Sequence, residues 1–233
     1  PPPGAVREAA ATPSLPFGLP RILPMAQALL ILKPDAGHRL AVRSAVAAWL
    51  AGQEASLGAR LEALTWFQPS TELIEAHYDF LRGRPFFPWL VDFMTALPVL
   101  VGRVAAEPAM LETLRYELGE TFVQKARPGS LRERYGIYAG VNCLHLSDSP
   151  ESGEREIGIW SRHVGLDRHE TDLDGGGGRP DHTFHLRSLA SQIAAGEHAE
   201  LAKLETKRLL KEESGLEGTR LEALCRVILG AFS

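Results

Sequence analysis

Three short apolar runs, set between segments of helical spacing, constrain the fold of this chain more than any other feature. The runs Ala26–Leu32, Arg60–Phe67 and Val99–Ala105 have the length and composition of buried strands. The spacing of apolar residues elsewhere predicts helices over Leu40–Leu50, Ser70–Phe80, Phe87–Thr95 and Pro108–Leu118. Helices interleaved with a few strands cover a small sheet. The pattern therefore predicts one α/β domain over residues 25–161.

The regions on either side of this domain differ from it in composition. Residues 1–24 contain seven prolines and are expected to be disordered. Residues 162–180 include the run Gly175–Gly178, which no Lys-Ser/Thr pair follows, so a flexible linker is expected there rather than a phosphate-binding loop. Residues 181–233 place leucines at helical spacing on both sides of Gly215. We expect two helices there, packed on the domain or on another subunit.

The composition excludes several classes of protein. The 25 lysines and arginines are outnumbered by 29 acidic residues, which argues against a nucleic-acid binder that works through bulk positive charge. No apolar run reaches the roughly 20 residues of a membrane-spanning helix. Cys143 and Cys225 are too few for a disulfide scaffold. These features predict a cytoplasmic protein with neither nucleic acid nor membrane as a partner.

One histidine lies where a reactive imidazole would be well placed. His145 shortly precedes a predicted helix start, with Ser149 as cap and Pro150 at the first helical position. The N-terminus of a helix presents N–H groups that stabilise an anion. Glu156 follows on the same helix, positioned to hold one ring nitrogen and so to fix the tautomer that a nucleophilic histidine requires. From these residues alone, a merely structural or exposed histidine stays an alternative.

The segment around His145 also resembles a known signature. Asn142-Cys143-Leu144-His145-Leu146-Ser147-Asp148-Ser149 is similar to the N-x-x-H-G-S-D-S of nucleoside diphosphate kinases. Other segments that resemble the family's motifs are Lys33-Pro34-Asp35, His77-Tyr78, Arg84–Pro88, Leu118–Thr121 and Arg127–Arg132. They occur in the family's order over residues 26–160. The resemblance implies a ferredoxin-like α/β sandwich, with helices covering a four-stranded antiparallel sheet, plus a helical C-terminal extension.

The same resemblance implies a function. It makes His145 the nucleophile that carries the γ-phosphoryl group of a nucleoside triphosphate to a nucleoside diphosphate by a ping-pong route. Glu156 and Ser147 would support it, and Lys33 would act both in catalysis and in nucleotide binding. The matched nucleotide-binding positions are Lys33, Tyr78, Phe86, Leu90, Arg115, Thr121, Arg132 and Asn142. Phe86 would stack on the base, with Leu90 beside it.

The resemblance further implies the ligands and the assembly. ATP and other nucleoside di- and triphosphates would bind, and Mg²⁺ would arrive with the nucleotide, so no metal ligands of the protein's own are expected. A homo-oligomer is also implied. His182 and His185 lie near each other in the tail, but their spacing matches no standard zinc set.

Departures from the family pattern leave two alternatives. Leu146 stands where the family has glycine, and it would be strained if the backbone there needed a positive φ. That substitution and the long tail favour a catalytically inactive module that binds nucleotide or serves regulation or assembly. A second alternative keeps the kinase active and makes the tail a hairpin that docks a partner.

Overall fold

The computed structural model describes residues 25–167 and 178–232. The predicted disordered region, residues 1–24, lies outside the described residues, as do residues 168–177 of the predicted linker. In the part of the chain that is described, no helix is both long and apolar enough to cross a membrane.

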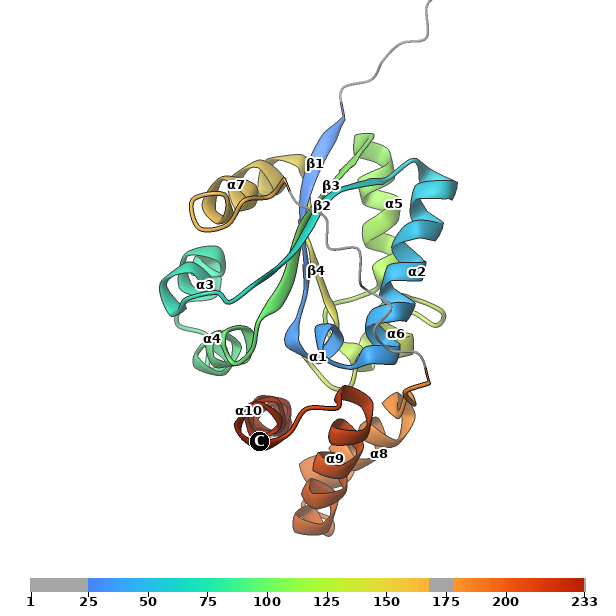
Figure 1. Cartoon of the computed structure of the whole chain (residues 1–233), viewed down its shortest axis with the longest axis vertical. Helices are drawn as coiled ribbons and strands as arrows, with labels where there is room; N and C mark the ends of the chain where they lie inside the picture. The colour runs from blue at the N-terminus through green and yellow to red at the C-terminus, as the bar shows by residue number, and fades with distance from the viewer. Residues whose placement is uncertain (1–24, 168–177, 233) are drawn as a thin grey trace, which may run out of the picture.

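A four-stranded antiparallel sheet forms the centre of the domain (Figure 1). Its strands, β1 (Ala26–Leu32), β2 (Arg60–Phe67), β3 (Val99–Ala106) and β4 (Leu144–Leu146), lie in the order β2-β3-β1-β4. The predicted four-stranded fold class is confirmed. Sequence spacing identified three of the strands, whereas β4 is only three residues long and too short to show a period. It pairs with β1 so that His145 lies opposite Ile31.

Helices cover both faces of the sheet. Figure 1 shows α3, α4 and α7 on one face, with α2 and α5 on the other. The bounds are α1 Pro34–Gly37, α2 Leu40–Leu57, α3 Thr71–His77, α4 Phe87–Thr95, α5 Pro108–Leu118, α6 Leu131–Tyr135 and α7 Pro150–Trp160. Because side chains of a strand alternate, Leu29 and Ile31 pack towards one face, and Leu30 and Leu32 pack towards the other.

Helix α7 is fixed closely against β1. It begins with a capping box, in which the Ser149 hydroxyl accepts the Ser152 N–H and the Ser152 hydroxyl accepts the Ser149 N–H. Gly153 faces the backbone of Gln27, where an added Cβ would lie 1.9 Å from the carbonyl oxygen. The absence of a side chain at 153 is therefore what allows the helix to approach the strand this closely.

The tail folds into three helices rather than the two expected. They are α8 (Thr183–Ala195), α9 (Ala199–Ser214) and α10 (Gly218–Leu229), followed by the 3₁₀ turn η3 (Gly230–Phe232). Gly196 ends α8 in the left-handed region, with φ 75°, and splits a leucine pattern that looked continuous in the sequence. We call Thr183–Phe232 the C-terminal extension. It packs beneath the domain in Figure 1, with α10 close to α4.

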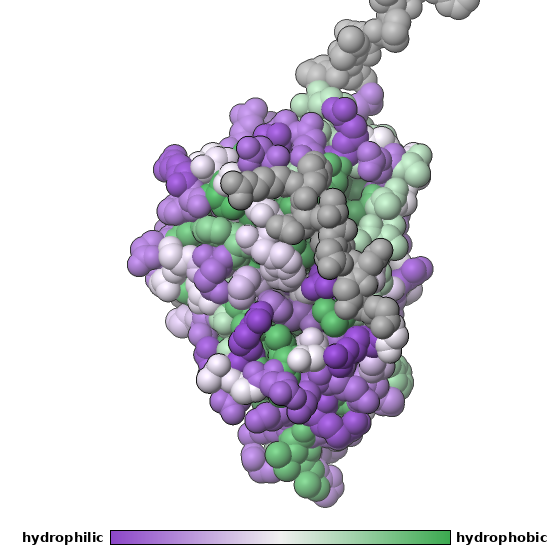
Figure 2. All heavy atoms as spheres, viewed as in Figure 1, coloured by the Kyte–Doolittle hydropathy of each residue, from purple (hydrophilic) through white to green (hydrophobic). Residues whose placement is uncertain are grey.

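A buried ion pair anchors the extension to the domain. Arg39, between α1 and α2, is fully buried and donates from Nε to Glu213 Oε2 over 2.5 Å. It also donates to the Thr183 hydroxyl and, over 3.0 Å, to the Tyr135 carbonyl. Burial lowers the pKa of Arg39, but the Glu213 charge outweighs it and raises the pKa above the ordinary value. Arg39 therefore keeps its positive charge. The face of the extension seen in Figure 2 is largely hydrophilic, with apolar side chains gathered at its lower tip.

Candidate active site

A cavity of about 640 Å³ lies beside the short strand β4. One end is apolar and is formed by Phe80, Leu81, Pro85, Phe86, Trp89 and Leu90. The other end is polar and contains Lys33, Arg115, Thr121, Arg132, Asn142 and His145. Every residue that the sequence predicted to bind nucleotide lines this cavity. The cavity also brings together residues from positions 33 to 231, a set that no local motif defines.

His145 is held by one ring nitrogen. It lies on β4 with its side chain 15% exposed, and its Nε2 is 2.7 Å from Glu156 Oε2. Because the carboxylate accepts the Nε2 proton of a neutral ring, the geometry assigns the lone pair to Nδ1. Burial works to raise the pKa of Glu156, but the hydrogen bond and charge of His145 outweigh it and lower this pKa to about 2. Glu156 therefore stays a carboxylate.

Ser147 supports Glu156 rather than the imidazole. Its hydroxyl donates to Glu156 Oε2 over 2.8 Å and accepts the Leu29 N–H over 2.8 Å. The serine thus ties the carboxylate on α7 to the backbone of β1. Together with the close approach at Gly153, this contact fixes where Glu156 meets His145.

A second histidine packs behind the first. The rings of His77 and His145 are 4.7 Å apart between centroids, and His77 Nδ1 accepts the indole N–H of Trp160 over 3.2 Å. Burial, followed by repulsion from His145, holds the pKa of His77 well below its usual range, so His77 is neutral. Ligand atoms of His77, His145 and Glu156 lie within 4.8 Å of one another, a spacing that a metal ion accepts. The bonds to Trp160 and Glu156 already engage one nitrogen of each ring.

The polar end of the cavity concentrates positive charge. Lys33 Nζ donates to Asn142 Oδ1 over 2.8 Å and to the Gly140 carbonyl over 3.3 Å. Burial, and then the charge of Arg132, lower the pKa of Lys33 to about 8. Burial, and then the charge of Arg115, lower the pKa of Arg132 to about 10. Cations that suppress each other's charge in this way would be stabilised by an incoming anion.

Other polar groups are placed for a ligand as well. The hydroxyl of Tyr78 is buried and has no hydrogen-bond partner among the residues that the structure describes. Such an orphaned group is costly unless a ligand satisfies it. The Asn142 amide donates to the Thr121 carbonyl over 2.6 Å and so joins two sides of the cavity. Arg115 donates to the Leu146 carbonyl over 2.7 Å and pairs with Asp148.

The strain considered for Leu146 does not arise. Leu146 lies in β4 opposite Leu30, fully buried in the core. The described non-glycine residues with positive φ are Ala139, Cys143 and His198, so Leu146 has an ordinary strand backbone. Its side chain packs on the same face of the sheet as Leu30 and Leu32. The backbone at Leu146 therefore gives no reason to expect an inactive module.

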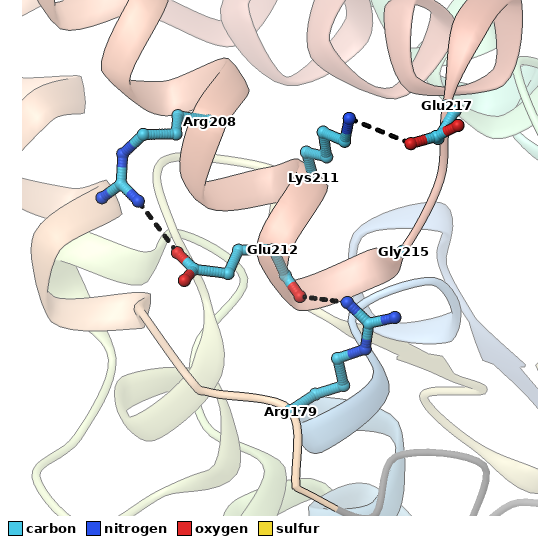
Figure 3. A pocket seen from close by; sticks show the side chains of 6 residues that line it. All are labelled: Arg179, Arg208, Lys211, Glu212, Gly215 and Glu217. Carbon is cyan, nitrogen blue, oxygen red and sulfur yellow. Dashed lines mark hydrogen bonds and ion pairs between the residues drawn. The ribbon is translucent and has the colours of Figure 1, made fainter.

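A second hollow, of about 360 Å³, lies between Arg179 and the extension that follows it (Figure 3). Arg208 pairs with Glu212 over 3.0 Å, and Lys211 pairs with Glu217 over 2.9 Å. Arg179 donates to the Glu212 carbonyl over 3.0 Å. Each of these three cations is engaged, whereas Lys33 and Arg132 form no ion pair with a described residue, so this hollow offers an anion little.

Comparisons with known proteins agree with this geometry. The family model for "Nucleoside diphosphate kinase" matches residues 26–164. The chain belongs to the nucleoside diphosphate kinase family. As a member of this family it is a phosphotransferase. The nucleoside diphosphate kinase of Chloroflexus aurantiacus is 39% identical over 136 residues, which cover 58% of this chain and 87% of that protein. The C-terminal extension lies outside the residues that the family model matches.

Solved structures of the family show the same fold. The nucleoside diphosphate kinase of Aquifex aeolicus matches with a TM-score of 0.52 and 32% identity, covering 62% of this chain and 99% of that one. The enzyme of Halobacterium salinarum, in complex with CDP, matches with a TM-score of 0.53 and 28% identity, covering 59% and 88%.

Several residues of the cavity were not identified from the sequence. Phe80, Trp89 and Phe122 lie in segments whose aromatic residues usually belong to the core. Asp148 lies within the signature, but the sequence does not indicate that it pairs with Arg115. Gly230 and Ala231 also line the cavity, although they belong to η3, far along the chain. The position of Asp148 between the signature residues Ser147 and Ser149 could have indicated its place in the site. No nearby motif in the sequence indicates a role for Gly230 and Ala231.

Proposed function

We propose that this chain transfers the γ-phosphoryl group of a nucleoside triphosphate to a nucleoside diphosphate through a phosphohistidine at His145. The observation that carries the proposal is the hydrogen bond between His145 Nε2 and Glu156, which leaves the Nδ1 lone pair as nucleophile in a cavity rich in cations. Nδ1 attacks the γ-phosphorus while the bond to the β-phosphate oxygen breaks, and the nucleoside diphosphate leaves. A second diphosphate then takes the group back through its terminal oxygen.

The cations stabilise the charge that shifts during transfer. Lys33, Arg115 and Arg132 line the polar end, and an oxygen of the phosphate chain would accept a hydrogen bond from the Tyr78 hydroxyl, which has no partner among the described residues. Thr121 and Asn142 complete the contacts with phosphate or sugar. The Halobacterium salinarum relative was solved in complex with CDP, which supports nucleotide binding by this chain.

The nucleoside occupies the apolar end. Phe86 is 43% exposed, which leaves its ring face free for a base to stack on, and Leu90 lies one turn further along α4. Stacking on a ring discriminates weakly among bases. A broad range of nucleotides is therefore expected as substrates.

Magnesium fits this cavity as a companion of the nucleotide. Of the carboxylates that line the described cavity, Glu156 is engaged by His145 and Ser147, while Asp148 pairs with Arg115 and is mostly exposed. Mg²⁺ would therefore be held chiefly by phosphate oxygens, and Asp148 is the lining carboxylate that could add to its coordination. When bound, the ion neutralises phosphate charge.

The assembly and the cellular location are further parts of the proposal. A homo-oligomer follows from the family resemblance, and a cytoplasmic location follows from the composition. The molar mass of the purified chain in solution, measured by light scattering, tests the first of these. A value near the 25.4 kDa of a single chain would contradict it.

The test follows the phosphoryl group itself. The protein is incubated with γ-labelled ATP and Mg²⁺, and unlabelled GDP is then added. We expect acid-labile label on the protein that chases into GTP and is absent from His145→Ala. His163→Ala, a change at an exposed histidine outside the cavity, is the matched control and should label normally. Label missing from the unaltered protein, or retained by His145→Ala, would contradict the proposal.

A further inference from the structure

The C-terminal extension reaches the nucleotide cavity. Gly230 and Ala231 of η3 are among the residues that line it, although η3 lies beyond the part of the chain that the family model matches. Phe232 next to them is buried and packs edge-on against Tyr138, with ring centroids 5.3 Å apart. Tyr138 directly precedes Ala139 and Gly140, which also line the cavity. The end of the extension is thus seated on the cavity's own rim.

The extension also holds the aromatic side of the cavity. Trp89 donates its indole N–H to the Val227 carbonyl at the end of α10, over 2.8 Å. Its ring stacks on Phe93, and an added Cβ at Gly230 would lie 3.1 Å from Trp89 Cδ1. Trp89 lies on α4 three residues after Phe86. The contact therefore fixes the helix that presents the base-stacking ring.

A third contact supports the polar end. Arg187 of α8 donates from Nε to the Gly136 carbonyl over 2.7 Å and from Nη2 to the Arg132 carbonyl over 3.3 Å. These carbonyls lie in and just after α6, the helix that carries Arg132. A cation at a helix C-terminus stabilises both the carbonyls and the helix dipole. The extension thus lines the cavity only through Gly230 and Ala231, and Arg187 supports from outside the cavity the helix that carries Arg132.

We propose that the extension forms one side of the nucleotide site within the same chain, and that the Gly230–Ala231 segment contacts the nucleoside part of the ligand. The proposal rests on the function proposed above for this cavity. Glycine, alanine and phenylalanine offer η3 no charged side chain for phosphate, and η3 adjoins Trp89 at the apolar end. The extension therefore limits the room available to the base, and a purine, which is larger, is affected before a pyrimidine.

The experiment fills this side of the cavity. Ala231→Phe adds bulk beside the base while leaving Phe232 and every phosphate contact in place, and the dissociation constants of ADP and CDP are measured by calorimetry. Ala195→Phe, at an exposed position at the end of α8, is the matched control. We expect Ala231→Phe to weaken ADP binding by about tenfold and CDP binding by about threefold or less, as overpacking of this size typically does. The control should leave both constants unchanged.

A second variant removes the contact instead of crowding it. A chain ending at Leu229 lacks η3. We expect its dissociation constants for ADP and CDP to rise by factors similar to those expected for Ala231→Phe. Only the binding of nucleotides should be weakened. Labelling of His145 by phosphoramidate, a donor with no nucleoside, should proceed at the normal rate in both variants. Circular dichroism checks that both are folded.

The outcomes separate the two proposals. Unchanged ADP and CDP affinities in folded Ala231→Phe would overturn the role of the extension. An equal loss for both nucleotides together with slow phosphoramidate labelling would overturn it as well, because the change would then act by distorting the phosphate end. If the unaltered protein binds ADP but never labels at His145, the proposed catalytic function fails, and the binding constants still decide the role of the extension.

Discussion

The family domain and the C-terminal extension bury polar groups in opposite ways. Around the cavity of the domain, Lys33 and Arg132 have lowered pKa values, and the Tyr78 hydroxyl lacks a partner among the described residues. Where the extension meets the domain, Arg39 is buried just as deeply, but Glu213 and Thr183 satisfy it. Buried charge without an opposite charge beside it costs stability, whereas buried charge that is fully paired holds elements in place. The first kind indicates a ligand site, and the second indicates an anchor.

The anchor should give the largest effect on stability. Arg39→Met leaves Glu213 buried without its cation, and breaking a buried pair in this way typically costs about 3–5 kcal/mol. We expect a loss of that size in the free energy of unfolding, measured by chemical denaturation. The double variant Arg39→Met, Glu213→Leu should recover much of it, because no buried charge remains. A loss below about 1 kcal/mol for the single variant, the range of exposed ion pairs, would show that the two regions do not differ as described.

Substitution of Lys33 should lower activity and raise stability, whereas substitution of Arg39 should lower stability. Lys33→Met removes a proposed phosphate contact, and we expect kcat/KM to fall by roughly 10²–10³-fold, the usual cost of a lost charge-stabilising group. In the unaltered enzyme kcat/KM should decline as the pH rises above about 8, where free Lys33 loses its proton. The pH profile of kcat/KM measures this directly. The variant should lack that decline; a decline that survives the substitution would assign it to another group.

The stability of the same variant follows by linkage. The pKa of Lys33 falls from 10.5 to about 8 on folding, so the folded protein binds fewer protons between those values. The unaltered protein therefore gains stability relative to Lys33→Met as the pH rises through this window. Below pH 8 the variant should be the more stable by up to about 3 kcal/mol. Denaturation of both proteins at pH 7 and pH 10 checks the sign.

The smallest effect is expected on the surface of the extension. Arg208 pairs with Glu205 and Glu212, but all three side chains are largely exposed. Exposed pairs are screened by water and salt and contribute little. Arg208→Ala should leave the melting temperature and the turnover of nucleotides unchanged within error. A clear drop in either would give the hollow of Figure 3 a role that its geometry does not suggest.

The sequence predicted those features that depend on neighbouring residues, and it did not predict those that depend on distant contacts. The strands Ala26–Leu32 and Arg60–Phe67 were visible as short apolar runs, and the cavity residues could be named because their motifs resemble those of a family. The left-handed turn at Gly196 escaped detection, since leucines keep a helical spacing across it. The contributions of Arg39 and Ala231 were also invisible. Each depends on a partner that only tertiary packing brings near.

Gly153 carries a consequence for how this sequence can vary. It sits one turn before Glu156 on α7, at the point where a methyl group would collide with the Gln27 carbonyl on β1. To relieve that collision, α7 would have to move away from β1. The Glu156 carboxylate, which accepts the hydrogen bond of His145, would move with it. Any side chain at position 153 would therefore displace α7, and through Glu156 it would disturb the hydrogen bond that orients the imidazole of His145.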